Sequence, residues 1–265
     1  MPLNQSRLDR KVALVTSSSP GICASTARYL ASEGAKVMVC GRNANEGLAT
    51  VKQIRRDGGR ATFVLADVAT LPDVQAVIDE TIATYGQLDI LFNNISSRYP
   101  QDGPLLSVSE SVWDRVIEPL LKGTFFCCQY ALPFLQQGES GTIINLIEKI
   151  PESQDRSVSA VCQGGMLAMT QAIAQQVAAS AVTANVIWAA PAMAEASQVS
   201  IADKSPLPIE ISLLSSQLLT GPSIGADGLP IDTARPFVDI AEAVMYLACY
   251  GDTLHGSALW VNTSN

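Results

Sequence analysis

Short runs of β-branched residues alternate with longer segments of helical periodicity along most of this chain. The run KVALVT at 11–16 is followed by apolar residues at helix spacing and then by KVMVC at 36–40, which predicts a β–α–β unit. Strands that are apolar at consecutive positions and separated by crossover helices indicate a parallel sheet covered on both faces. The pattern continues with predicted strands at 61–67, 88–94, 141–147, 182–188 and 257–261, and with helices near 72–85, 111–137, 159–180 and 237–250.

This order of elements predicts a single α/β domain over residues 1–265. We expect a doubly wound sheet of the Rossmann type, with about seven parallel strands flanked by helices. Residues 189–236 form one long irregular insertion, and PLPIEISLLSSQLL within it predicts a short amphipathic helix. An insertion of this length is either a lid over a ligand or a loop that a partner covers, and the sequence favours neither.

The charge and the composition argue against several classes of partner. A formal net charge of −8 and a pI of about 4.7, without a long basic run, disfavour nucleic acid and anionic membranes. No stretch reaches the roughly 20 apolar residues of a membrane span, and MPLNQSRLDRKVALVT has no apolar leader, so we expect a cytoplasmic protein. The six cysteines lack metal-ligand spacing and His255 is the one histidine, so we expect buried thiols and no metal site.

A weakened nucleotide-binding turn follows the first predicted strand. The segment 16–23, TSSSPGIC, resembles the TGxxxGxG turn of the short-chain dehydrogenase/reductase family, although Ser17 and Cys23 replace two of its three glycines. In such a turn the backbone approaches a pyrophosphate at the amino end of a helix. The resemblance implies that Ser18, Gly21 and Ile22 contact a dinucleotide cofactor.

The next strands also end in residues that match the cofactor site of this family. Arg42 follows the second strand where a carboxylate would hold a ribose, so any cofactor is expected to be NADP(H) rather than NAD(H). The alternative for Arg42 is a solvated surface arginine. Asp67 and Val68 match the pair that contacts adenine, and Asn93 begins a segment, NNIS, that resembles the NNAG turn of the family.

The residues that carry hydride chemistry in this family are replaced in this chain. The segment SAVCQGGMLAMTQAIA at 159–174 resembles the active-site helix, with Ser159 in place of the tyrosine and Gln163 in place of the lysine. Ile147 stands at the position of the substrate-orienting serine and Leu120 at that of the helix asparagine. None of the six tyrosines precedes a lysine by four residues. Because serine is a poorer acid and glutamine carries no charge, we expect no conventional hydride transfer.

Other residues near the same edge of the predicted sheet are candidates for a different chemistry. Glu148 is a candidate acid or base with a raised pKa, or else forms an exposed ion pair with Lys149. Tyr99 is either a phenolic hydrogen-bond donor or a loop residue without a role. Trp188 forms an aromatic wall for a ligand or fills the core. The predicted substrate pocket consists of Trp188, Ser159, Gln163 and Met193.

These residues leave three functions open. The first is a non-redox step, such as isomerisation, cyclisation or elimination, on a small hydrophobic molecule. The second is a catalytically silent NADP(H)-binding protein or structural partner of an active family member, and the third is an NADP-dependent oxidoreductase with an unorthodox acid such as Tyr99 or bound water. The helices at 111–137 and 159–180 carry apolar residues on more than one face, so a homo-oligomer, a dimer or tetramer, or a hetero-oligomer with an active family member is expected. The apolar residues in question are Phe125, Phe126, Leu132, Phe134, Met166, Leu167 and Met169.

Overall fold

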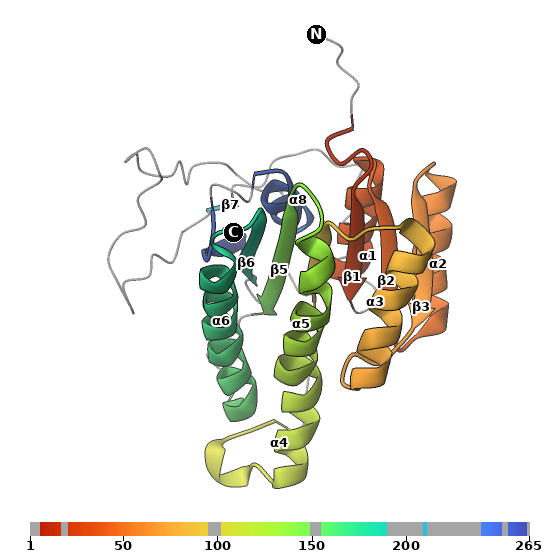
Figure 1. Ribbon diagram of the computed structural model, residues 1–265. Helices are drawn as coiled ribbons and strands as arrows, with labels where there is room; N and C mark the ends of the chain where they lie inside the picture. Colours follow the sequence, from red (N-terminus) through yellow and green to blue (C-terminus); the bar gives the residue numbers. More distant parts are fainter. Residues whose placement is uncertain are drawn as a thin grey trace.

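The computed structural model describes residues 6–16, 21–94, 102–148, 155–189, 209–210, 240–250 and 254–263. Their strands form one sheet in the order β3-β2-β1-β4-β5-β6-β8-β7. All neighbours are parallel except β7 and β8, so the predicted doubly wound α/β fold with seven parallel strands is confirmed (Figure 1). The strands are β1 (Val12–Thr16), β2 (Lys36–Gly41), β3 (Arg60–Leu65), β4 (Ile90–Asn93), β5 (Gly141–Glu148), β6 (Val182–Ala189), β7 (Ile209–Glu210) and β8 (Ala258–Thr263).

The short strand β7 corrects one expectation. Residues 209 and 210 lie inside the segment for which we predicted an amphipathic helix, and they pair antiparallel with Thr263 and Asn262 at the sheet edge. The helix prediction is therefore wrong at these two residues, because the edge of β8 supplies backbone partners that local periodicity cannot reveal. The rest of that predicted helix lies outside the described residues, as does most of the insertion at 189–236.

Helices cover both faces of the sheet, as Figure 1 shows. Buried residues of α1 (Ile22–Ser32), α2 (Ala44–Arg56) and α8 (Ile240–Tyr250) share one hydrophobic cluster with the sheet. Buried residues of α3 (Leu71–Tyr85), α5 (Thr124–Leu135) and α6 (Ser157–Val177) share the other. Along β1, Ala13 and Val15 belong to the first cluster and Leu14 to the second, as the alternation of side chains along a strand requires.

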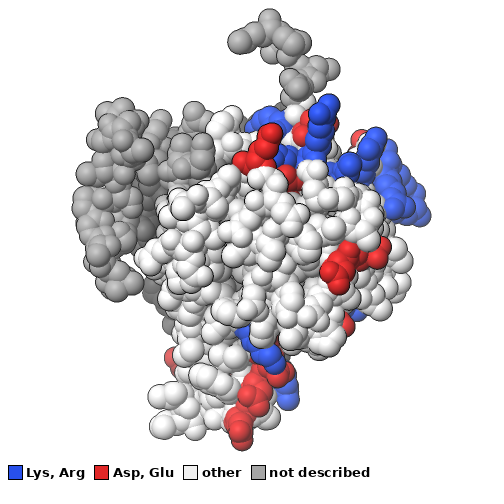
Figure 2. Space-filling view, viewed as in Figure 1, with Lys and Arg blue, Asp and Glu red and all other residues white. Residues whose placement is uncertain are grey.

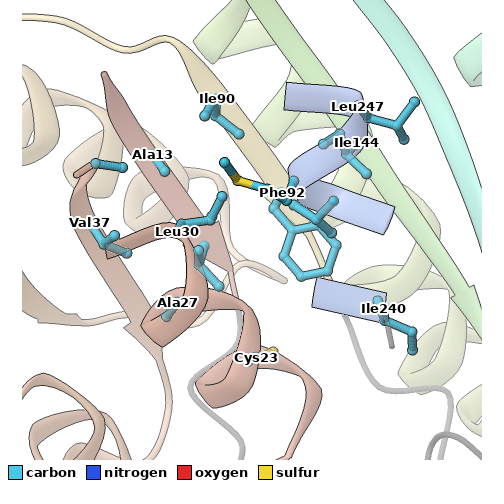
Figure 3. Close-up of a cluster of buried hydrophobic side chains, with 14 of the residues drawn as sticks. Ala13, Cys23, Ala27, Leu30, Val37, Ile90, Phe92, Ile144, Ile240 and Leu247 are labelled. Atoms are coloured by element: carbon cyan, nitrogen blue, oxygen red, sulfur yellow. The ribbon is translucent and has the colours of Figure 1, made fainter. Parts of the chain in front are cut away.

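The first cluster is centred on a fully buried aromatic ring. Phe92 of β4 has no exposed surface and lies among side chains from α1, β5 and α8 (Figure 3). The same cluster contains Ala27, Leu30, Ile144, Ile240 and Leu247, which are labelled in that view. This cluster joins strands on both sides of the sheet, β2 and β1 on one side and β4, β5 and β6 on the other, to the same layer of helices.

Helix α2, which the sequence analysis did not predict, connects β2 and β3. Its amino end is capped by Asn43, whose side chain accepts hydrogen bonds from the backbone N–H groups of Asn45 (3.1 Å) and Glu46 (3.4 Å). One face of α2 is buried through Val51 and Ile54. A capped helix with a narrow apolar stripe is what a connection between two parallel strands needs.

The predicted long helix near 111–137 contains an irregular turn. It consists of α4 (Glu110–Ile117), a π-helical segment η2 (Glu118–Gly123) and α5 in direct succession, after a 3₁₀ turn η1 (Leu105–Ser107). Ser109 caps α4 by accepting a hydrogen bond from Val112 N at 3.3 Å. Pro119 lies in the π segment, where it removes one backbone donor. This part of the helix extends past the end of the sheet in Figure 1.

The cysteines behave as the sequence predicts. None of the six cysteines, all of which lie within the described residues, forms a disulfide; Cys249 is half-buried and the other five are buried. Burial raises the pKa of the Cys128 and Cys162 thiols to about 12. These groups therefore stay protonated and act as small apolar residues at neutral pH. Within the described ranges, no helix has the length and apolar character needed to cross a membrane.

Candidate functional site

The strand order reverses at β1 and β4, and in an open parallel sheet the carboxyl edge at this point is where a ligand crevice is expected. From β1 the chain proceeds to β2 and β3 on one side, and β4, β5 and β6 lie on the other. Open parallel sheets bind ligands at such a switch point. Gly21 stands here at the amino end of α1 with φ +105°, a backbone conformation that glycine adopts without strain. Ile22 is the first residue of α1, and Ser18 lies outside the described residues.

Cys23, for which the sequence analysis predicted the place of a family glycine, fits between helix and strand. Its side chain is 1% exposed, and the thiol lies 3.5 Å from the carbonyl oxygen of Thr16. The side-chain amide of Asn94 donates to the Cys23 sulfur at 2.6 Å. The Cys23 side chain is thus accommodated in the core at the amino end of α1, where it contacts the ends of β1 and β4.

Two predicted cofactor residues face each other from the ends of β2 and β3. A guanidinium nitrogen of Arg42 lies 3.8 Å from a carboxylate oxygen of Asp67, and the Arg42 side chain is 73% exposed. The backbone N–H of Asp67 donates a hydrogen bond to the carboxylate of Asp73 at 2.7 Å, which fixes the backbone of Asp67. Arg42 is therefore an exposed arginine paired with Asp67, and its contact with a cofactor phosphate stays a prediction. The backbone carbonyl of Val68, the next residue, faces Gly123 of the π segment.

The two asparagines that end β4 differ in environment. The Asn93 side chain is buried in the sheet, donating to Asn145 Oδ1 at 2.9 Å and accepting from the Thr16 hydroxyl at 3.4 Å. Any contact of Asn93 with a cofactor would therefore use its backbone, and that contact stays a prediction. Asn94, which the sequence analysis included only as part of the NNIS segment, has a buried side-chain oxygen without a hydrogen-bond partner among the described residues. That oxygen is an acceptor available at the end of β4.

The amino end of α6 is held by a carboxylate from a distant segment. Asp102 accepts hydrogen bonds from Val158 N (3.1 Å), Ser159 N (2.8 Å) and the Ser159 hydroxyl (2.6 Å). Ser159 is fully buried and its hydroxyl proton points at this carboxylate. Sequence reasoning missed Asp102 because 57 residues separate it from Ser159 and no local motif joins them.

Gln163 is also engaged within the protein. Its side-chain amide donates to the backbone carbonyl of Glu148 at 2.6 Å, which joins the second turn of α6 to the end of β5. The side chain of Glu148 is half-buried at the last position of this strand. Its predicted role as an acid or base stays a prediction. The polar groups of Ser159 and Gln163 thus both contribute to holding α6.

The remaining candidate positions on these elements are apolar contacts. Leu120 is 3% exposed and packs with Val116, Val158 and Cys162 between the long helix and α6. Ile147 is 2% exposed in a separate cluster against which Trp188 packs from β6. Trp188 is therefore at least partly a core residue, in keeping with one of its two predicted roles. Tyr99, Lys149 and Met193 lie outside the described residues.

Comparison with known proteins identifies the family of this chain. The model of the short-chain dehydrogenase family matches residues 11–204. The chain belongs to this family. One relative is the 3-oxoacyl-[acyl-carrier-protein] reductase FabG of Staphylococcus aureus. The two sequences are 34% identical over 180 residues, a match that covers 67% of this chain and 72% of the relative.

Two further comparisons extend over nearly the whole chain. A cis-4-hydroxycyclohexanecarboxylate dehydrogenase of Sinomonas cyclohexanicum is 32% identical over 243 residues, 90% of this chain and 89% of the relative. The crystal structure of a dehydrogenase/reductase from Sinorhizobium meliloti 1021 superposes with a TM-score of 0.74, covering 97% of this chain and 96% of that one at 24% identity. The second comparison establishes the fold, and the first extends the family resemblance past the family match.

These relatives correct the first functional hypothesis. The sequence favoured a non-redox step, such as isomerisation, cyclisation or elimination, because the tyrosine and lysine of the family are replaced. That hypothesis is wrong, since the family and the relatives named above are dehydrogenases and reductases. Even where a proton donor is expected to be missing, its loss would remove one mechanism and would not indicate another reaction. The assignment of Ser159, Gln163, Leu120 and Ile147 to the family's catalytic positions stays a prediction.

Members of this family generally bind nicotinamide dinucleotides, and the residues present fit one half of such a cofactor better than the other. In the adenosine half, Gly21 permits close backbone approach and Arg42 offers an exposed cation. In the nicotinamide half, α6 contains no lysine or arginine from Ser157 to Val177. Within this helix, only backbone groups and uncharged side chains are available to that end of a cofactor.

Proposed function

We propose that this chain binds NADP(H) and acts as an oxidoreductase of the short-chain dehydrogenase family. The observation that carries the proposal is the placement of Arg42 beside Asp67 at the crevice, with Gly21 at the amino end of α1. A guanidinium at the end of β2 suits a 2′-phosphate, and a helix amino end suits a pyrophosphate. The dehydrogenase and reductase names of the relatives support the redox assignment.

When bound, the reduced cofactor supplies a hydride to a carbonyl carbon, and the alkoxide that forms must receive a proton. The hydroxyl of Ser159 is not available for this, because it donates to Asp102 at 2.6 Å and is fully buried. The amide of Gln163 is engaged by the Glu148 carbonyl. In this proposal the proton therefore comes from bound water or from Tyr99, and the protein contributes mainly by binding and orienting the two reactants.

Replacing Arg42 by glutamate tests the choice of cofactor. We expect the dissociation constant of NADPH to rise at least tenfold, about 1.4 kcal/mol, because a cation that faces the 2′-phosphate becomes an anion. NADH lacks that phosphate, so its affinity should change less than threefold, as measured by isothermal titration calorimetry. Arg56→Glu, with the same charge change in the last turn of α2, is the control. Equal losses for the two cofactors, or no loss, would contradict the proposal.

A second candidate is an NADP(H)-binding protein without turnover, and one observation favours it specifically. The Ser159 hydroxyl donates its hydrogen bond to Asp102, and the Gln163 amide donates to the Glu148 carbonyl, so both groups are engaged within the protein. The two candidates separate in a single assay that follows NADPH fluorescence and absorbance with a panel of carbonyl compounds. Oxidation that Tyr99→Phe abolishes supports the oxidoreductase with a phenolic acid, whereas binding without oxidation supports the silent protein.

We also propose that a second copy of this chain covers the face formed by α5 and α6. A groove of about 680 Å³ lies between these helices, lined mainly by apolar side chains. Figure 2 shows that the face over these two helices is largely uncharged. Phe125, at the groove, is 46% exposed. The apolar lining includes Leu121, Phe125, Phe126, Leu132, Met169 and Ile173.

Phe125→Glu tests this association. A dimer or tetramer is expected for the wild type, and the charged variant should shift it toward monomer because a carboxylate is costly to bury at an apolar interface. Sedimentation velocity over a range of concentrations measures the shift. Leu48→Glu, at an exposed position of α2, is the control that should leave the assembly unchanged. A wild-type monomer at high concentration would contradict the proposal.

A further inference from the structure

Asp102 is a buried carboxylate that no local helix motif explains. It is 7% exposed and lies between β4 and the 3₁₀ turn η1, on the segment that leaves the carboxyl edge of the sheet. Both carboxylate oxygens accept hydrogen bonds from the first turn of α6. The neighbouring carbonyl of Gly103 accepts a further bond from Ser157 N at 3.1 Å. Three consecutive residues of α6 are thus bonded to two consecutive residues of the distant segment.

These bonds replace a cap that the helix does not supply itself. The residue before the helix is Arg156, and no side-chain cap bond is made at that position. The first backbone N–H groups of a helix have no partner within the helix, and a carboxylate that accepts from them also interacts favourably with the helix dipole. The position of the amino end of α6 is therefore set by Asp102 and not by the residues that precede the helix.

The first two turns of α6 lie over one half of the crevice. Gln163 bonds to the carbonyl of Glu148, which places the second turn at the carboxyl end of β5. In a doubly wound sheet each half binds one mononucleotide of a dinucleotide. Since Arg42 and Asp67 stand at the ends of β2 and β3, the nicotinamide end belongs over β4 to β6. The turn that Asp102 holds borders that end.

Apolar packing makes the same turn sensitive to the loss of Asp102. Val158 and Cys162 of α6 pack with Val116 and Leu120 of the long helix in a small cluster of four buried residues. The cluster is too small to fix the direction of a helix start alone, because such contacts are not directional. The hydrogen bonds of Asp102 therefore orient the first turn of α6, and the apolar cluster packs against the turn in that orientation.

We propose that Asp102 is a positioning residue for the nicotinamide end of the site. The proposal rests on the proposed binding of NADP(H). Asp102 acts through α6: it fixes the first turn, and with it the wall of the crevice against which the nicotinamide riboside is placed. It does not touch the adenosine end. Its removal should therefore weaken a complete dinucleotide and spare a fragment that consists of the adenosine half alone.

The test compares NADPH with adenosine 2′,5′-bisphosphate by calorimetry in the full-length chain. For Asp102→Ala we expect at least a tenfold loss of NADPH affinity and less than a twofold change for the fragment. Asp102→Asn keeps one acceptor oxygen and should lose less, and it serves as the second variant where the alanine variant does not fold. Ser109→Ala removes the cap of α4 and is the matched control; it should weaken neither ligand.

Alkylation of Cys162 gives an independent local measure. This thiol lies on α6 beyond the held turn and is 1% exposed, so mass spectrometry of alkylated peptides should show faster labelling in Asp102→Ala. Labelling of Cys127 and Cys128, buried in a different cluster, should stay slow. Unchanged labelling of Cys162 in Asp102→Ala would overturn the positioning role, whereas faster labelling at all three sites would show that this variant unfolds, and the same measurement on Asp102→Asn then decides.

The outcomes for this residue and for the proposed function are distinct. If the wild type binds neither ligand, the proposed function fails and the role of Asp102 fails with it. If the wild type binds both but Asp102→Ala weakens both equally, or leaves NADPH affinity unchanged, only the positioning role is overturned. If the wild type binds the fragment but not NADPH, the adenosine site stands and the role of Asp102 is again overturned.

Discussion

Replacing Asp89 by alanine is expected to lower the free energy of unfolding by about 3 kcal/mol. The carboxylate is 5% exposed at the amino edge of the sheet and accepts from the backbone N–H of Val12 at 2.8 Å, at the start of β1. It also accepts from the Gln87 amide at 2.7 Å and from the Lys11 ammonium at 3.2 Å. Alanine would leave the buried N–H of Val12 without its acceptor and would remove the partner of a half-buried cation.

The controls separate the charge of Asp89 from its hydrogen bonds. Asp89→Asn keeps an acceptor for Val12 N but loses the ion pair, so its loss of stability should be intermediate. Glu33→Ala breaks an ion pair with Arg7 that lies on the surface, and the expected loss is below about 1 kcal/mol. Urea unfolding followed by circular dichroism measures all three. A loss for Asp89→Ala no larger than that for Glu33→Ala would show that the carboxylate is not a structural centre.

The fold was predictable because its signal is local and repeated. Each strand of the parallel sheet is apolar at consecutive positions, as in VALVT of β1, and each helix between strands has an apolar stripe. The failure at Ile209–Glu210 has the opposite cause. Amphipathic periodicity at this segment predicts a helix when the sequence is considered locally. The strand that pairs with it, β8, lies about fifty residues further along the chain and gives no local signal.

The candidate site was predictable only where a residue follows a strand directly. Gly21, Arg42 and Asp67 were identified because the segments around them resemble the cofactor-binding motifs of the family, and the fold places these segments at the ends of strands. Asp102 was not, because its partners on α6 are more than fifty residues away and a lone aspartate before a loop carries no pattern. The functional hypothesis erred for a related reason: it inferred a new chemistry from absent residues, whereas the comparisons show which chemistry the family performs.

Replacing Gly123 by alanine is expected to cost about 2–3 kcal/mol of stability, although its backbone is helical with φ −61°. A Cβ at this position would lie 2.5 Å from the carbonyl oxygen of Val68 and 3.3 Å from that of Glu118. Both are backbone atoms that cannot rotate away. The π segment would therefore have to move off the turn after β3, and the loss exceeds the small gain in helix propensity that alanine brings.

Gly123→Ala should also weaken cofactor binding, because a shift of Val68 would displace its neighbour Asp67, which pairs with Arg42. We expect NADPH and adenosine 2′,5′-bisphosphate to weaken together, in contrast to Asp102→Ala. Gly164→Ala is the matched control: this glycine is exposed in α6 with no atom within 4 Å of the added Cβ, and the change should stabilise by up to about 1 kcal/mol. Equal stability of the two alanine variants in urea would mean that the helix and the turn after β3 do not touch as described. A destabilised Gly123→Ala with unchanged fragment affinity would instead separate this contact from the adenosine site.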